Sequence, residues 1–174
     1  WSMPEEINRV LTDRLADFLL IPSLDAKKNL RREGIFPKKI HFVGNIMIDT
    51  LKLFVSRGSQ PKAEKIPGKY YFCTLHRAEN VDNKKVFSEI LSALEVISRD
   101  AAICLPLHPR TKKMAEKFGL LEKLQSICKI LLPLSYAQSV AYQKNARLIF
   151  TDSGGVQEEA SYLGIPCLTL RTET

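Results

Sequence analysis

Between residues 70 and 145, short apolar runs that fit buried strands alternate with longer stretches of helical periodicity. The predicted strands are 70–74, 102–107 and 130–132, and the predicted helices are 82–98, 110–118, 121–126 and 136–145. Such alternation indicates right-handed βαβ units on a parallel sheet. We therefore predict an α/β fold with a doubly wound parallel sheet, helices on both faces, and ligands bound beyond the carboxyl ends of the strands.

The first 56 residues carry similar signals over shorter segments. Pro4, followed by acidic and apolar residues at helical spacing, predicts a helix over 4–15. Strands are predicted at 18–21 and 40–43, and helices at 25–33, started by Ser23 or Asp25 and ended by Gly34, and at 46–55. Residues 56–68 contain glycine, proline and mixed charges and form the one plausible linker. The predicted domains are therefore residues 1–56 and 69–174.

Residues 147–170 read as strand, glycine-rich turn, helix, turn and strand. An apolar run at 148–150 fits a buried parallel strand, and Asp152 and Ser153 are residues typical of a helix N-cap. The glycine pair 154–155 lets backbone N–H groups approach an anion without a Cβ in the way. This layout predicts a phosphate-binding turn.

Glu159 lies one helical turn beyond Gly155 on the same predicted helix face. Its carboxylate could accept hydrogen bonds from hydroxyl groups beside a bound phosphate, so the combination suits a nucleotide-sugar diphosphate and its ribose. The alternative is that residues 152–155 merely cap a helix, because glycine-rich turns from strand to helix are common in α/β proteins.

Three polar clusters follow predicted strand ends, at residues 75–80, 108–110 and 152–155, and should converge on one cleft. His76 and Arg77 can offer hydrogen-bond donors and positive charge to a diphosphate. Alternatively, they form a surface pair satisfied by Glu79. His108 either faces the ligand or caps the next helix.

Composition limits the class of partner. The chain has 174 residues, 45% of them hydrophobic, and shows neither an apolar run of membrane-spanning length nor a secretory signal, so we expect a cytoplasmic globular protein. A net charge of +7 is compatible with a nucleic-acid partner. Lysine and arginine are, however, scattered through amphipathic stretches and do not form one basic block. We therefore expect neither a nucleic-acid nor a membrane partner, and favour an anionic small molecule.

The four cysteines lie in or beside apolar, strand-like runs, without CxxC or Cys/His spacing typical of metal ligands. We expect reduced, buried thiols and no metal site.

Five ordered motifs resemble the non-hydrolysing UDP-N-acetylglucosamine 2-epimerase family over essentially the whole chain. They occupy residues 3–9, 43–49, 75–80, 108–109 and 151–160. The resemblance implies the second Rossmann-like lobe of a two-lobe fold of the glycosyltransferase-B type, preceded by the segment that crosses between the lobes. It also implies that this chain is a fragment lacking the first lobe and truncated at the C-terminal end of the second.

The activity implied by the resemblance is inversion at C2 of UDP-N-acetylglucosamine to give UDP-N-acetylmannosamine. The implied route is proton abstraction at C2, anti elimination of UDP and its re-addition, with no nicotinamide cofactor and no metal. A homodimer serving cell-surface polysaccharide biosynthesis is implied for the full-length protein. A UDP-sugar glycosyltransferase of the same fold and a nucleotide-binding module without chemistry remain alternatives.

The resemblance assigns roles to matching positions. Glu5 matches an acid/base carboxylate and His76 the histidine that meets the diphosphate. The implied substrate-binding residues are Arg77, Ser153, Gly154, Gly155 and Glu159, with Glu159 on the ribose and Arg77 the weaker candidate. Family carboxylates from the first lobe have no counterpart here, so little or no turnover is expected. Many relatives have an aromatic residue for the uracil base near the position of Ser139. The residues that pack against the base and the exact substrate sugar are therefore left open.

Overall fold

The computed structural model describes residues 4–56 and 68–171. The chain divides into two compact units, Trp1–Thr50 and Leu51–Thr174, with the boundary inside helix α3 (Ile46–Ser56). Most of the linker predicted at 56–68 lies outside the described residues. Among the described residues, no helix is both long and apolar enough to cross a membrane.

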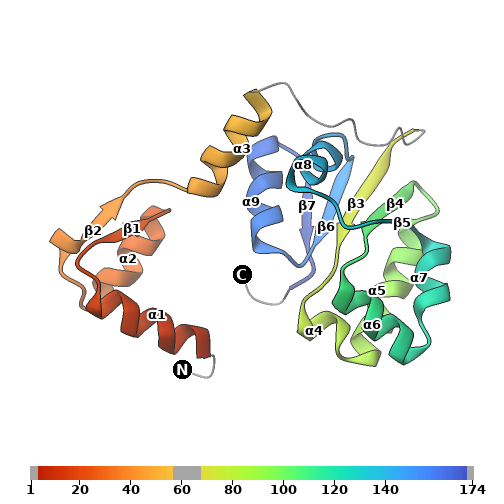
Figure 1. The fold of residues 1–174 in the computed structure, drawn as a ribbon, viewed down its shortest axis with the longest axis horizontal. Helices are drawn as coiled ribbons and strands as arrows, with labels where there is room; N and C mark the ends of the chain where they lie inside the picture. The colour runs from red at the N-terminus through yellow and green to blue at the C-terminus, as the bar shows by residue number, and fades with distance from the viewer. Residues whose placement is uncertain (1–3, 57–67, 172–174) are drawn as a thin grey trace. The chain divides into compact units, whose positions relative to one another are not determined.

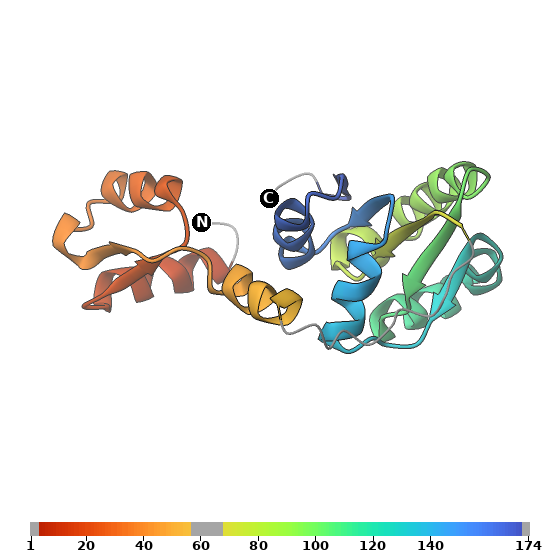
Figure 2. The same cartoon turned by 90° about the horizontal axis from the view of Figure 1, so that it is seen from above.

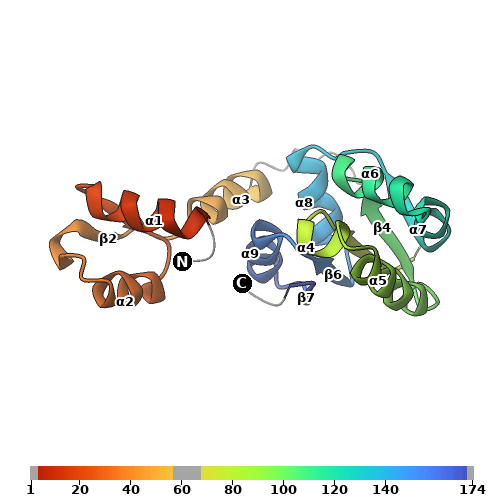
Figure 3. The same ribbon diagram turned by 90° about the horizontal axis from the view of Figure 1, so that it is seen from below.

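The first unit places short helices beside a small parallel sheet (Figure 3). Besides the start of α3, its elements are α1 (Pro4–Leu15), β1 (Leu19–Ile21), α2 (Leu24–Arg32), a 3-10 turn (Pro37–Lys39) and β2 (Ile40–Phe42). Ser23 caps α2 by accepting a hydrogen bond from the Ala26 N–H at 3.1 Å, and Gly34 follows the helix with φ +82°. Both ends of the predicted second helix are therefore confirmed to within a residue or two.

The second unit continues the alternation of strand and helix (Figure 1). Its elements are β3 (Tyr70–Thr74), α4 (Ala78–Val81), α5 (Lys84–Ile97), β4 (Ala102–Pro106), α6 (Pro109–Phe118), α7 (Leu121–Ile127), β5 (Cys128–Leu131), α8 (Tyr136–Lys144), β6 (Leu148–Thr151), α9 (Gly154–Leu163) and β7 (Cys167–Thr169).

These strands form a parallel sheet of order β5-β4-β3-β6-β7. The chain starts in the middle at β3, adds β4 and β5 on one side, and then crosses to β6 and β7 on the other. The strand order therefore reverses between β3 and β6. In open α/β sheets this switch point leaves a crevice at the carboxyl ends of the two strands, where ligands bind.

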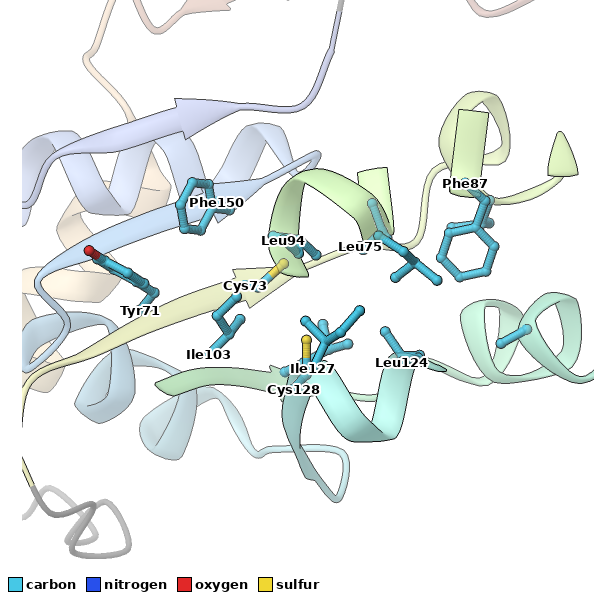
Figure 4. Packing of buried hydrophobic residues seen from close by; sticks show 14 residues of the cluster. Tyr71, Cys73, Leu75, Phe87, Leu94, Ile103, Leu124, Ile127, Cys128 and Phe150 are labelled. Atoms are coloured by element: carbon cyan, nitrogen blue, oxygen red, sulfur yellow. The ribbon is translucent and has the colours of Figure 1, made fainter. Parts of the chain in front are cut away.

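The residues of the strands alternate between two cores, one on each face of the sheet. Helices cover both faces of this sheet (Figure 2). Tyr71 and Cys73 of β3 point to the face covered by α5, α6 and α7, whereas Tyr70 and Phe72 point to the face covered by α8 and α9. Figure 4 shows the first core, where Phe87, Leu94 and Leu124 of the helices meet the sheet. Burial on both faces is typical of a doubly wound sheet and confirms the predicted fold class.

One predicted helix differs in the structure. The helix expected over 82–98 is α5, which begins two residues later, at Lys84, because the Asn83 side chain accepts hydrogen bonds from the N–H groups of Lys85 and Val86 and caps the helix there. The short α4 was not predicted. The strand expected at 130–132 begins earlier, at Cys128, and ends before the exposed Leu132.

Candidate functional site

A pocket of about 230 Å³ opens at the carboxyl ends of β3, β4 and β6. The residues lining it include His76, His108, Pro133, Ser139, Ser153 and Val156. Members of all three polar clusters predicted from the sequence therefore contribute to one cavity. Their convergence is confirmed. The cavity lies at the switch point of the sheet, where ligands bind in open α/β sheets.

Asp152 joins the ends of β3 and β6. Its side chain is 0% exposed, and Oδ2 accepts hydrogen bonds from the backbone N–H groups of His76 and Arg77, both at 2.8 Å, and from Asn80 Nδ2 at 3.2 Å. Oδ1 lies 3.1 Å from Nδ1 of His76. Although the sequence suggested a helix cap, Asp152 instead holds the loop that carries His76 and Arg77.

These donors decide the charge of Asp152. Burial acts to raise the pKa of the carboxyl, but the hydrogen bonds from His76, Arg77 and Asn80 outweigh it and hold the pKa below its ordinary value. Asp152 is therefore an ionised carboxylate at neutral pH. Next to it, the imidazole of His76 has Nδ1 directed to Asp152, and the side chain keeps 35% of its surface exposed.

His108 combines the two roles that the sequence left open. It lines the pocket, with its ring centroid 5.3 Å from that of His76, and its Nδ1 accepts the N–H of Arg110 at 3.1 Å to cap α6. Burial and, next, the neighbouring His76 lower the pKa of His108. The capping contact also requires a neutral Nδ1 acceptor, which agrees with that direction.

Arg77 lies against the same turn. Its Nε donates to the backbone carbonyl of Asp152 at 3.3 Å. Glu79 approaches Arg171, with Oε1 3.7 Å from Nε, so its ion-pair partner is Arg171 and not His76 or Arg77. The interpretation of His76 and Arg77 as a surface pair satisfied by Glu79 is therefore wrong, because among the described residues Glu79 pairs with Arg171.

The glycine-rich turn begins α9. Ser153 is the N-cap residue, but its side chain makes no capping hydrogen bond, and its N–H donates to Thr151 Oγ1 at 2.9 Å. Neither Gly154 nor Gly155 has a positive φ, so backbone strain does not require glycine here. A Cβ at position 154 would lie 3.9 Å from Nη1 of Arg171. The turn therefore offers a hydroxyl and the first N–H groups of a helix, with a guanidinium nearby.

Glu159 is 5% exposed on the second turn of α9. Its Oε2 accepts a hydrogen bond of 2.6 Å from Gln143 Nε2 on α8. Tyr136 lies at the start of α8; burial, then the negative charge of Glu159 and hydrogen bonding to it, raise the pKa of Tyr136 to about 12. Sequence reasoning missed Gln143 and Tyr136, since no spacing rule links them to Glu159.

Glu5 belongs to the first unit. It is exposed in the first turn of α1, where a carboxylate interacts favourably with the helix dipole. Among the described residues, no group of three or more histidine, cysteine, aspartate or glutamate side chains could hold a metal ion. The cysteines are free: Cys73, Cys104 and Cys128 are buried and Cys167 is partly buried.

A parallel sheet of this order, with a glycine-rich helix N-terminus and polar loops at its switch point, defines an α/β protein with a Rossmann-like lobe. The whole chain, residues 1–174, matches the model of the family described as UDP-N-acetylglucosamine 2-epimerase. The chain belongs to this family.

Individual relatives agree with this assignment. The UDP-N-acetylglucosamine 2-epimerase of Methanococcus maripaludis is 43% identical over 99% of this chain and 50% of its own length. The crystal structure of the Methanocaldococcus jannaschii UDP-GlcNAc 2-epimerase in complex with UDP-GlcNAc and UDP matches with TM-score 0.85 and 45% identity, over 98% of this chain and 49% of that one. The Rickettsia bellii enzyme matches with TM-score 0.82 and 29% identity, over 98% and 46%. The chain therefore spans about half the length of these relatives.

Proposed function

We propose that this chain supplies the UDP-binding half of a UDP-N-acetylglucosamine 2-epimerase. The observation that carries the proposal is the meeting of His76 and Ser153 in one pocket at the switch point of the sheet. The membership of the family supports the reaction, and the solved complex of the Methanocaldococcus jannaschii relative with UDP-GlcNAc and UDP supports the ligand.

The diphosphate would bind at the N-terminus of α9. The first N–H groups of a helix lack partners within the helix, and its dipole favours a negative charge there. Ser153, Gly154 and Gly155 are the proposed contacts, with the Ser153 hydroxyl free of any capping bond. His76 and Arg77 face the same turn and would add donors, and Asp152 keeps their loop in place.

The ribose would bind beside Glu159. An ionised carboxylate accepts hydrogen bonds from vicinal hydroxyl groups, and Glu159 stands on the helix that begins with the phosphate turn. Its burial makes such bonds stronger than they would be in water.

In the proposed reaction a base removes the proton from C2 of the sugar, and the C1–O bond to UDP breaks to leave a C1–C2 double bond. UDP then adds back at C1 while C2 receives a proton on the opposite face. Donors at the diphosphate stabilise the charge that develops on the leaving group. His76 is the proposed donor, and Glu5 is a proposed acid/base group. A cytoplasmic homodimer is part of the same proposal.

Binding of UDP to the chain, measured by titration calorimetry, tests the site. Ser153→Ala and Glu159→Ala should each weaken UDP binding by about 1–3 kcal/mol, because each removes a hydrogen bond to a charged or buried partner. Ser92→Ala and Glu89→Ala, on the exposed side of α5, are matched controls and should not change the affinity. Unchanged UDP affinity in both site variants would reject the site.

The chemistry requires a second experiment. The whole protein, incubated in heavy water with UDP-N-acetylglucosamine, should incorporate deuterium at C2 and release the 2-epimer. Binding of the sugar nucleotide without exchange at C2 would reject the epimerase. Transfer of the sugar to an acceptor, without free epimer, would instead identify a glycosyltransferase.

A further inference from the structure

Glu159 sits in a polar contact between α8 and α9 that its proposed role in ribose binding does not explain. Gln143 of α8 is 0% exposed, and its Nε2 lies 2.6 Å from Glu159 Oε2 and 3.3 Å from Ser139 Oγ. Burying a glutamine completely is costly unless its amide is hydrogen-bonded. The short bond to the carboxylate is therefore the main compensation for burying Gln143.

The orientation of the amide follows from charge. With Nε2 toward Glu159 the contact is attractive, whereas the reversed amide would place its oxygen against a carboxylate oxygen. In this orientation Oε1 of Gln143 is buried and has no hydrogen-bond partner among the described residues. The amide donates to Glu159 while its own acceptor oxygen has no partner in the described part of the chain. The contact with the carboxylate therefore determines the orientation of the amide.

Tyr136 is a second polar neighbour of Glu159. A capping box formed by Ser135 and Gln138 starts α8, so Tyr136 is the first residue of the helix. The ring of Phe54 packs edge-on against Tyr136, with centroids 4.9 Å apart. Among the described residues, no lysine or arginine lies within ion-pair distance of Glu159. Gln143, a neutral and fully buried donor, therefore fixes the direction of this carboxylate from α8, with the side chain of Tyr136 as a second neutral group near it.

We infer that Gln143 and Tyr136 are positioning residues that fix the Glu159 carboxylate for the two ribose hydroxyls and so make the site select ribose over 2'-deoxyribose. This inference rests on the ribose role of Glu159 in the proposed function. Recognition of two neighbouring hydroxyls needs both carboxylate oxygens in a fixed plane, and a glutamate without these neighbours can rotate about its last side-chain bond. A site that hydrogen-bonds a ligand hydroxyl discriminates against the analogue without that hydroxyl only if the acceptor of the site is held in position.

The test measures the dissociation constants of UDP and 2'-deoxy-UDP for the full chain by titration calorimetry. The wild type should prefer UDP about tenfold or more, as expected for a hydrogen bond to a charged acceptor. Gln143→Met keeps the volume and removes the donor, and should lower this preference several-fold, toward the value of Glu159→Ala. Tyr136→Phe removes the hydroxyl of the second neighbour at a position that is 37% exposed, and should lower the preference in the same direction.

Asn145→Ala is the matched control on α8. Asn145 donates to the carbonyl of Ala141 at 2.8 Å near the end of the helix, so its loss weakens α8 without touching Glu159. The preference for UDP should persist in this variant. A merely structural role of Gln143 would weaken both ligands equally and leave their ratio unchanged.

The outcomes separate the inference from the function on which it rests. A wild type that binds UDP and 2'-deoxy-UDP equally has no ribose contact at Glu159, which rejects that role and the inference with it. A wild type that prefers UDP, with the same preference in folded Gln143→Met and Tyr136→Phe, overturns the inference alone. If circular dichroism shows that Gln143→Met is unfolded, the ratio in Tyr136→Phe decides.

Discussion

Replacement of Asp152 by asparagine should destabilise the second unit, because this carboxylate joins two strands through the loop that follows one of them. Oδ2 accepts three hydrogen bonds, two from backbone N–H groups and one from Asn80. A hydrogen bond to a charged acceptor contributes roughly 1 kcal/mol more than a neutral one, so three weakened bonds amount to about 3 kcal/mol. Asparagine also avoids burying a charge, which offsets part of this loss. We expect a decrease of about 2 kcal/mol in the free energy of unfolding.

The pH dependence of the unfolding free energy follows from the lowered pKa of Asp152. The pKa of Asp152 is lower in the folded state than its ordinary value of 3.8, so the folded state favours the ionised form. The stabilisation is complete above about pH 4 and is lost as the pH falls from there through the folded pKa. Asparagine does not titrate. The difference in unfolding free energy between the wild type and Asp152→Asn should therefore be largest near pH 7 and shrink toward pH 3.

Urea denaturation followed by circular dichroism at pH 7 and pH 3 measures this difference. Hydrogen exchange reports the local effect, since the amides of His76 and Arg77 should lose protection in Asp152→Asn. The control Asp82→Asn removes an exposed carboxylate that pairs with Arg110 at 2.6 Å and should change stability far less. A difference for Asp152→Asn that is the same at both pH values, with unchanged exchange at His76 and Arg77, would refute the reasoning.

Other variants test separate features of the fold and site. Phe87→Ala should lower the free energy of unfolding by about 3–5 kcal/mol in urea denaturation, because Phe87 is fully buried against the sheet; a loss below 1 kcal/mol would contradict this packing. Gly164→Ala should cost about 1–2 kcal/mol in the same assay, since position 164 ends α9 with φ +69°. In an NMR titration, His108 should have a pKa below its ordinary value of 6.5, and a value above it would contradict the capping geometry. Spectrophotometric titration, compared with Tyr136→Phe, should assign Tyr136 a pKa of about 12.

Much of the second unit could be predicted because its signals are local. Apolar runs gave β3 over 70–74 without error, and residues 147–170 gave the strand, turn, helix and strand that the structure contains. The differences concern the hydrogen bonds that side chains make, or do not make, at helix starts, which periodicity does not show. Asn83 capped α5 and moved the start of that helix to Lys84, two residues after the predicted start. Ser153 occupied the N-cap position without using its side chain.

The candidate site was predictable in its members but not in its connections. The sequence placed His76, His108 and Ser153 after strand ends, and the rule for parallel sheets brought them together. It did not show that Asp152 would hold the loop of His76 and Arg77, across 76 and 75 residues. Nor did it pair Gln143 with Glu159, since the two stand on different helices.

The amino-acid sequence by itself determined the alternation of strands and helices, the two-sided burial of the sheet and the family to which the chain belongs. These properties depend on residues a few positions apart, where periodicity, capping and glycine conformation act directly. Only the tertiary structure decided which carboxylate supports the site and which donors orient Glu159. Those contacts join segments that the strand order brings together, and a hydrogen bond between them depends on distances and directions that no local pattern encodes.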